Sequence, residues 1–241
     1  MIRLTEPQRH HDCQVLVIGS GAGGATTAAL LAEAGLDVLI VEEGAWVEQD
    51  SVVPFSLDQM DRQYRSGGVT VALGRPSIAY TEGRCAGGGT EINSGLYRRP
   101  SEATLARWRT DYAIADFGDD EFFAACDEIE QALSVQTVPG RHTPASELLR
   151  RGAAELGWQH DEIPRWMTYP DGEDAATGRR QSMTRTYLPR AVEAGARLLC
   201  DHRVDRLIVD RRRAFRAELT GPGETPVTVD FEHVFVCGGA I

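Results

Sequence analysis

The sequence predicts an α/β fold: a mainly parallel sheet with a small antiparallel meander and one helical insertion. Three observations support this prediction. Residues 13–44 contain a strand, a glycine-rich turn, a helix of small residues and a second strand in that order. Residues 101–157 have the spacing of amphipathic helices. Residues 197–237 contain short apolar runs separated by turn residues, as expected for strands.

The first strand–turn–helix unit is the most informative part of the chain. Val15 to Ile18 is a short apolar run typical of a buried parallel strand. A G-x-G-x-x-G turn over residues 19–24 follows, and Ala25 to Ala34 is then expected to form a helix. The second strand, Val38 to Val41, ends at Glu42. This order of elements is the pattern of a dinucleotide-binding unit.

Each part of this unit has a physical task. Gly19 permits a tight turn, Gly21 lets backbone approach a pyrophosphate, and Gly24 lets the helix lie close to the strand. The helix N-terminus then faces the anion. Glu42 can accept hydrogen bonds from ribose hydroxyls, and its charge disfavours a 2′-phosphate, so we expect FAD or NAD rather than NADP. The candidate binding residues here are Gly19, Ser20, Gly21, Ala22, Gly24 and Glu42.

Composition excludes several classes of function. The 241 residues carry a formal net charge of −11, which disfavours a nucleic-acid groove or an anionic membrane surface. The five cysteines are far apart and form no C-x-x-C pair, so we predict reduced thiols, no metal site and a cytoplasmic location. We find no signal peptide and no apolar run long enough to span a membrane.

The segment after Glu42 leads to a second glycine-rich stretch. We expect a short helix over Leu57 to Tyr64, a turn at residues 67–68, and two short strands, Val69 to Leu73 and Ile78 to Thr81. Residues 83–100 read GRCAGGGTEINSGLYRRP, and the three consecutive glycines allow backbone to lie flat against a ligand. Taken alone, such a loop is more often a flexible connector.

The two glycine-rich stretches together resemble the glucose–methanol–choline (GMC) family of FAD-dependent oxidoreductases. The first resembles the family's FAD motif, with Glu42 at its ribose-binding acid. The second resembles the family's first signature in Gly83-Arg84, Gly87-Gly88-Gly89-Thr90, Ile92-Asn93, Tyr97 and Pro100. Ala86 departs from it, because the family usually has a larger aliphatic residue there.

The resemblance implies further contacts with the cofactor. It places Arg84, Gly87, Gly88, Thr90, Asn93, Gly95 and Leu96 along the flavin and pyrophosphate. It also implies that Val204 meets the adenine and that Gly239 lies in the turn that returns to the pyrophosphate. Some members attach FAD through a histidine just before the asparagine; this chain has Ile92 there, so we predict non-covalent FAD.

The remaining elements follow from periodicity and capping residues. We assign residues 10–99 to the first part of an FAD-binding domain, 100–183 to a helical insertion and 184–241 to its second part. Helices are expected at Ser101 to Asp111, Asp119 to Leu133, Thr143 to Leu156 and Thr184 to Ala194. Strands are expected at Arg197 to Cys200, Val204 to Val209, Ala214 to Leu219, Val227 to Phe231 and Val234 to Cys237. Trp158, Trp166 and Tyr169 are interpreted mainly as core residues.

The resemblance implies oxidation of an alcohol, with a histidine base and hydride transfer to the flavin N5 atom. None of the six histidines lies in a matching motif, so we assign no catalytic residue. The family's catalytic half is expected beyond Ile241, as a possible C-terminal partner segment. We therefore expect little turnover from this chain alone.

Two other functions remain open at this point. A non-catalytic dinucleotide-binding protein would bind cofactor without reducing it. An NAD-dependent dehydrogenase is disfavoured by the 83–100 loop and the long helical insertion, because nicotinamide-binding domains continue with regular βα units. The alcohol and the electron acceptor are not specified by the sequence.

Overall fold

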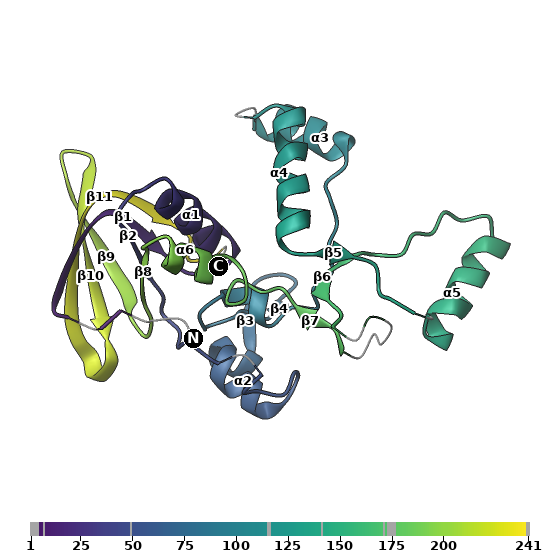
Figure 1. The fold of residues 1–241 in the computed structure, drawn as a ribbon, viewed down its shortest axis with the longest axis horizontal. Helices are drawn as coiled ribbons and strands as arrows, with labels where there is room; N and C mark the ends of the chain where they lie inside the picture. Colours follow the sequence, from purple (N-terminus) through teal and green to yellow (C-terminus); the bar gives the residue numbers. More distant parts are fainter. Residues whose placement is uncertain are drawn as a thin grey trace. The chain divides into compact units, whose positions relative to one another are not determined.

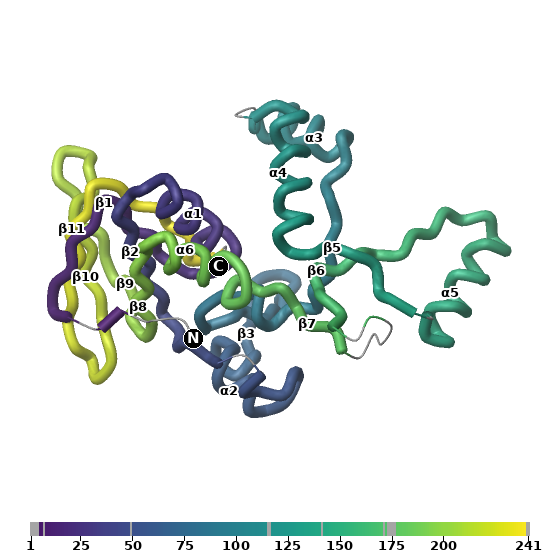
Figure 2. The backbone as a smooth tube through the Cα atoms, in the orientation of Figure 1, coloured from purple at the N-terminus to yellow at the C-terminus, as the bar shows by residue number. Residues whose placement is uncertain are grey.

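The computed structural model describes residues 5–6, 8–48, 50–114, 117–140, 142–170, 172 and 177–239. The chain divides into two compact units, one of residues 1–93 with 182–241 and one of residues 94–181. The path of the chain can be followed in Figures 1 and 2. These units divide the chain at 93/94 and 181/182, whereas the domain boundaries predicted from the sequence lie at 99/100 and 183/184.

A six-stranded sheet in the order β8-β2-β1-β11-β10-β9 forms the centre of the first unit (Figure 1). Strands β8, β2, β1 and β11 are mutually parallel, whereas β10 runs antiparallel to both β11 and β9. The strands are β1 (His10–Ile18), β2 (Val38–Val41), β8 (Arg197–Leu199), β9 (Arg203–Asp210), β10 (Arg213–Gly221) and β11 (Thr225–Val236). The predicted parallel sheet and antiparallel meander are confirmed.

Strand β11 corrects the sequence analysis. We expected two strands, Val227 to Phe231 and Val234 to Cys237, but Thr225–Val236 is one strand of 12 residues. Its first half pairs antiparallel with β10, and residues from Thr228 onward pair parallel with β1. Glu232 and His233, which looked like a break between two runs, are exposed positions of the continuous strand. The meander and the parallel sheet therefore share β11.

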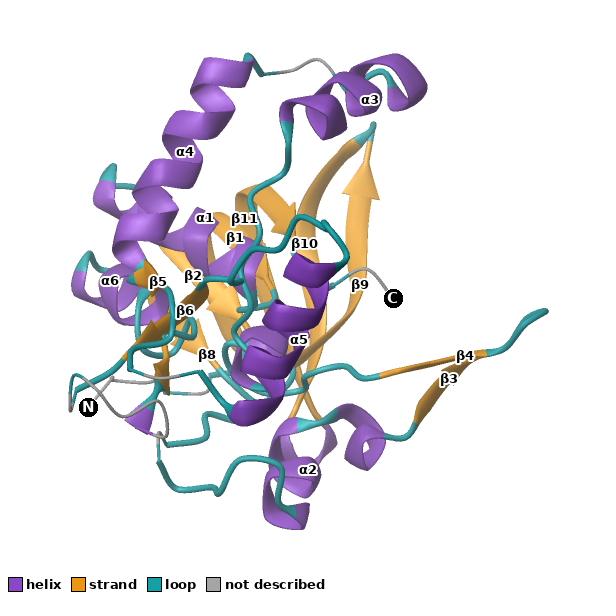
Figure 3. Ribbon diagram, turned by 90° about the vertical axis from the view of Figure 1, so that its right-hand side faces the viewer, coloured by secondary structure: helices purple, strands orange, loops and turns teal. Residues whose placement is uncertain are grey.

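Helices α1 (Ala22–Glu33) and α6 (Tyr187–Glu193) pack together against the parallel strands (Figures 1 and 3). Four alanines of α1 are buried, at positions 25, 28, 29 and 32. Small side chains let this helix lie close to the sheet. Helix α6 begins three residues later than expected, because turns occupy residues 182–186.

Leucine, valine and aromatic side chains form the core that joins the parallel strands to the meander. Leu16, Leu39 and Leu199 come from β1, β2 and β8, and Val229 and Phe231 from β11. Burying one such side chain contributes about 1.5–3 kcal/mol. This core fixes the carboxyl ends of β1, β2 and β11 beside one another.

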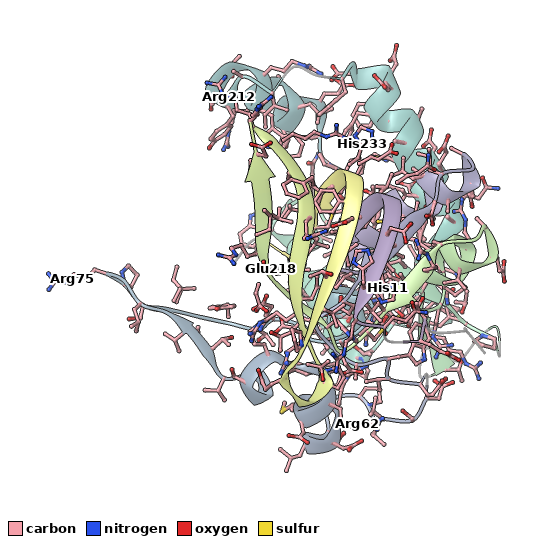
Figure 4. All side chains as sticks on the ribbon, turned by 90° about the vertical axis from the view of Figure 1, so that its left-hand side faces the viewer. His11, Arg62, Arg75, Arg212, Glu218 and His233 are labelled. Carbon is pink, nitrogen blue, oxygen red and sulfur yellow. The ribbon has the colours of Figure 1, made fainter. Side chains whose placement is uncertain are left out.

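The first unit also contains α2 (Leu57–Gln63) and the hairpin of β3 (Thr70–Ala72) and β4 (Ile78–Tyr80). Ser56 accepts a hydrogen bond from the Gln59 N–H and so caps α2. The hairpin projects from this unit, with Arg75 at its tip (Figures 3 and 4). The predicted helix and both predicted strands are confirmed, with bounds one or two residues shorter.

The second unit contains α3 (Glu102–Tyr112), α4 (Asp119–Ala132), α5 (Pro144–Glu155) and a three-stranded sheet. The three predicted helices are confirmed, and Ser101 and Thr143 cap α3 and α5 as their sequence positions indicate. Strands β5 (Val135–Gln136), β6 (Arg165–Thr168) and β7 (Arg179–Arg180) were not predicted. Trp166 in β6 is buried as expected, but Trp158 is 67% exposed, so the core interpretation was wrong for Trp158.

Candidate cofactor site

A cavity of about 690 Å³ opens in the first unit at the carboxyl ends of β1 and β2. Ligands of parallel α/β sheets bind at this place. The structure brings most of the predicted site residues around this cavity: Gly19, Ser20, Gly21, Ala22, Glu42, Arg84, Gly88, Thr90, Asn93, Val204 and Gly239. Gly24 and Gly87 lie next to lining residues. Gly95 and Leu96 belong to the second unit, and their place beside the flavin stays a prediction.

Two glycines are required by close backbone contacts beneath the cavity. Gly19 has φ +94°, and a Cβ there would lie 2.5 Å from the carbonyl oxygen of Cys237. A Cβ on Gly24 would lie 2.0 Å from the carbonyl oxygen of Gly19. Only glycine therefore allows α1 to start directly against the end of β1, which explains the tight turn and close packing expected of these positions.

Gly21 differs from both, because it faces the cavity rather than protein. A Cβ on Gly21 would meet no atom within 4 Å. Gly21 is the N-cap of α1 and no side chain caps the helix, nor does its first turn contain an acidic residue. The first N–H groups of α1 can thus bind an anion. This open backbone surface fits a pyrophosphate.

The second glycine stretch lies directly against the first. The Gly87 N–H donates to the Ser20 hydroxyl oxygen at 3.0 Å, and a Cβ on Gly88 would lie only 3.2 Å from the Cα of Gly21. Gly87 and Gly88 both have positive φ, +86° and +55°. The residues from Gly88 to Glu91 form a short 3₁₀ turn. The loop therefore forms one wall of the cavity, where the sequence taken alone favoured a connector.

Glu42 is buried at the end of β2 and accepts three hydrogen bonds. Its Oε2 accepts from the Ser20 N–H at 2.9 Å and from the Ser20 hydroxyl at 2.5 Å, and its Oε1 accepts from the Gly44 N–H at 2.8 Å. Burial raises the pKa of Glu42, and these hydrogen bonds partly offset that rise. A carboxylate offers about four acceptor positions, so one remains for a ribose hydroxyl.

The sequence analysis missed a group of ion pairs at the same cavity. Arg65 binds Glu43 with Nη2–Oε2 at 2.8 Å and binds Glu82 with Nε–Oε2 at 2.8 Å. Arg84, which was predicted to contact the cofactor, also lies 3.1 Å from Glu43. The Arg65 guanidinium holds the pKa of Glu43 below its ordinary value. No motif marks Arg65, because its partners lie 22 and 17 residues away in other elements.

Replacing Arg65 with glutamine should lower the free energy of unfolding at pH 7 by about 1 kcal/mol, since the Arg65 side chain is about one third exposed and its two partners are more buried. The pKa of Glu43 is lowered in the folded protein, so its stabilisation is present above the ordinary value of 4.5 and is lost as pH falls. The difference in urea midpoint between wild type and Arg65→Gln should therefore shrink from pH 7 to pH 4.

The matched control is Arg62→Gln, because the Arg62–Asp58 pair is more exposed and should contribute less than about 0.5 kcal/mol. Equal effects of the two substitutions would contradict the importance of the Arg65 pairs.

His202 also lines the cavity, but its ring is held structurally. It is buried, and its Nδ1 lies 2.7 Å from the carbonyl oxygen of Cys200. Among the residues that the structure describes, no cluster of three or more histidine, cysteine or acidic side chains could hold a metal ion. The same residues include no helix with the length and apolar composition needed to cross a membrane.

The comparisons with known proteins assign the family. A model of the family described as GMC oxidoreductase matches residues 60–241, which is more than half of the chain. The chain belongs to the GMC oxidoreductase family. A model described as FAD binding domain matches residues 12–52, the region of the first glycine turn and Glu42. The predicted family and the predicted FAD cofactor are confirmed.

Two relatives illustrate how much of a GMC protein this chain represents. An uncharacterized GMC-type oxidoreductase of Sinorhizobium fredii is 39% identical over 95% of this chain and 47% of its own length. The long-chain-alcohol oxidase FAO3 of Arabidopsis thaliana is 28% identical over 83% of this chain and 27% of its own length. The chain thus spans about half, or less, of the curated relatives that it matches.

Two solved structures share the fold of this chain. Pyridoxine 4-oxidase from Mesorbium loti superposes with a TM-score of 0.70 at 18% identity, over 95% of this chain and 50% of that protein. An FAD-dependent oxidoreductase from Chaetomium thermophilum gives a TM-score of 0.72 at 19% identity, over 94% of this chain and 45% of that protein. At these identities the likeness shows the fold alone.

Proposed function

We propose that this chain is the FAD-binding part of a GMC oxidoreductase that oxidises an alcohol, and that it holds FAD without a covalent bond. The contact between the two glycine loops at one cavity carries the proposal. The named activity of the Arabidopsis relatives, long-chain-alcohol oxidation, supports a CH–OH substrate. A cytoplasmic location remains part of the proposal, supported by five free cysteines.

The residues of this chain would bind and orient the cofactor. The N-terminus of α1 and the open side of Gly21 would take the pyrophosphate, and Glu42 would accept hydrogen bonds from the ribose. The loop from Gly83 to Asn93 would form the wall next to the flavin. Bound FAD would supply the hydride acceptor for alcohol oxidation. No residue of this chain is assigned as the catalytic base.

The proposal is tested first by cofactor binding. The purified chain, refolded with FAD, should retain flavin colour through gel filtration, and NAD should not displace the flavin. After denaturation, mass spectrometry should show the unmodified polypeptide mass with FAD released, because Ile92 cannot form the histidyl bond. Flavin that stays with the denatured chain would contradict non-covalent binding.

Activity requires a second measurement. Alcohol-dependent reduction of a dye should be near zero for this chain alone and measurable when it is joined to the remaining half of the Sinorhizobium relative. A positioned general base contributes about 10²–10⁴-fold, and substrate orientation adds to this factor. Robust turnover by the isolated chain would contradict the absence of a catalytic residue. A joined protein that binds FAD but never reduces it would favour the non-catalytic alternative.

A further inference from the structure

A continuous chain of buried hydrogen bonds connects four segments that are distant in sequence. The Ser20 hydroxyl donates to Glu42 at 2.5 Å, and the Gly87 N–H donates to Ser20 Oγ at 3.0 Å. The Thr90 hydroxyl donates to the Gly87 carbonyl at 2.7 Å, and the Met183 N–H donates to Thr90 Oγ1 at 3.1 Å. All five residues are buried. This series of hydrogen bonds thus runs from the end of β2 to the turn before α6.

The direction of each hydrogen bond is determined by chemistry. The Ser20 hydroxyl donates its single proton to Glu42, so its lone pairs face the Gly87 N–H. A carbonyl only accepts, so the Thr90 proton points to Gly87 and its lone pairs face the Met183 N–H. Both hydroxyls therefore already use their proton inside the protein and do not offer it to a phosphate or flavin atom.

The glycine loop depends on this external support. Gly87 to Gly89 have no side chains of their own to fix their conformation, and glycine backbone has the largest freedom to lose on ordering. Ser20 reaches the loop from the other glycine turn and holds the N–H of its first residue. Buried hydrogen bonds in a connected series polarise one another, so the loss of one hydrogen bond weakens the next one.

We propose that Ser20 and Thr90 are positioning residues, and that their hydrogen bonds couple occupation of the ribose site at Glu42 to ordering of the Gly87–Asn93 loop. The inference rests on the proposed FAD site. Binding of the adenine half of FAD would fix the Glu42 carboxylate and, through Ser20, the peptide of Gly87. The wall for the flavin half would then be ordered before the flavin binds.

The test uses the full 241-residue chain and adenosine diphosphate (ADP), which has the adenine, ribose and pyrophosphate of FAD but no flavin. Hydrogen exchange measured by mass spectrometry should show that ADP slows exchange in peptides covering residues 19–24 and 83–93. In Ser20→Ala, ADP should still bind, because the backbone N–H groups of residues 20 and 44 remain hydrogen-bonded to Glu42. Its Kd should rise about fivefold, and the protection of residues 83–93 should be lost while that of residues 19–24 remains.

Ser56→Ala is the control. Ser56 is half-buried in the first unit, and its hydroxyl accepts from the Gln59 N–H at 3.1 Å in the cap of α2, apart from the series that joins Glu42 to Met183. This variant should lose a cap worth about 1 kcal/mol yet keep ADP-induced protection at residues 83–93. Equal loss of protection in Ser56→Ala and Ser20→Ala would indicate general loosening and would overturn the proposal.

The possible failures can be told apart. If ADP does not bind the wild-type chain, the FAD site itself is wrong. If ADP binds and protects residues 83–93 equally in wild type and Ser20→Ala, the coupling is wrong and the FAD site stands. If Ser20→Ala does not fold, the variants Thr90→Val and Thr90→Ser test the coupling in its place. Valine should abolish ADP-induced protection of residues 83–93, serine should retain it, and identical behaviour of the two would overturn the proposal.

Discussion

Replacing Gly21 with alanine is expected to weaken FAD binding by about 100-fold or more without changing the stability of the cofactor-free protein. Gly21 has φ −65° and ψ −167°, which alanine adopts without strain. Its Cβ would meet no protein atom within 4 Å and would enter the space that we assign to the pyrophosphate. Overfilling a packed contact by one methyl group costs about 1–3 kcal/mol, and loss of the closest backbone approach adds to this cost.

The measurement is titration of FAD followed by flavin fluorescence, together with the Tm of the cofactor-free chain. Gly118→Ala is the matched control, since Gly118 is also an uncapped N-cap glycine with negative φ and open space at its Cβ position. It should leave both FAD affinity and Tm near the wild-type values. Wild-type FAD affinity in Gly21→Ala would mean that the pyrophosphate does not lie over this residue.

Replacing Gly24 with alanine should destabilise the fold itself, because the added methyl group would collide with protein backbone and not with the cofactor. The added Cβ would lie 2.0 Å from the carbonyl oxygen of Gly19 and 3.3 Å from the Cβ of Cys237. Backbone of the turn cannot move aside as a flexible side chain could. We expect a loss of more than about 4 kcal/mol, which is a large part of the stability of a typical domain.

Soluble yield and Tm measure this effect. Gly23→Ala is the comparison, because the neighbouring Gly23 lies inside α1 and a Cβ there meets nothing within 4 Å. Alanine should leave the stability unchanged or raise it by up to about 0.5–1 kcal/mol, since alanine favours the helical conformation more than glycine and Gly23 stands in the first turn of α1. A Gly24→Ala protein that folds with the wild-type Tm would show that α1 does not start against the end of β1.

The sequence was sufficient to predict those parts of the site that depend on a local pattern of residues. The turn at residues 19–24, the strand Val38–Val41 and the acid after it follow from spacing alone, and the structure has them there. The contacts between the two glycine loops could be anticipated only through the family resemblance. Spacing within one segment carries no information about which other segment it will touch.

The features that were missed depend on tertiary structure. Arg65 lies in an ordinary polar turn, and its ion pairs form because the fold brings Glu43 and Glu82 close to it. Ser20 lines the cavity and stays a predicted cofactor contact, but no sequence pattern indicated that its hydroxyl hydrogen-bonds with Glu42 and Gly87. Strands of two residues such as β5 and β7 carry no periodicity, and β11 looked like two strands because exposed polar residues stand in its middle.

The position of β11 has a consequence for how the protein is made. This strand lies between β1 and β10, so the sheet joins residues near the start of the chain to residues 225–236. During synthesis on the ribosome, β2 emerges soon after β1, but β11, the neighbour of β1 on its other side, emerges more than 200 residues later. Pairing across such sequence separation is slow and leaves apolar strands exposed. We expect nascent chains stopped before residue 225 to bind no FAD and to be substrates for chaperones.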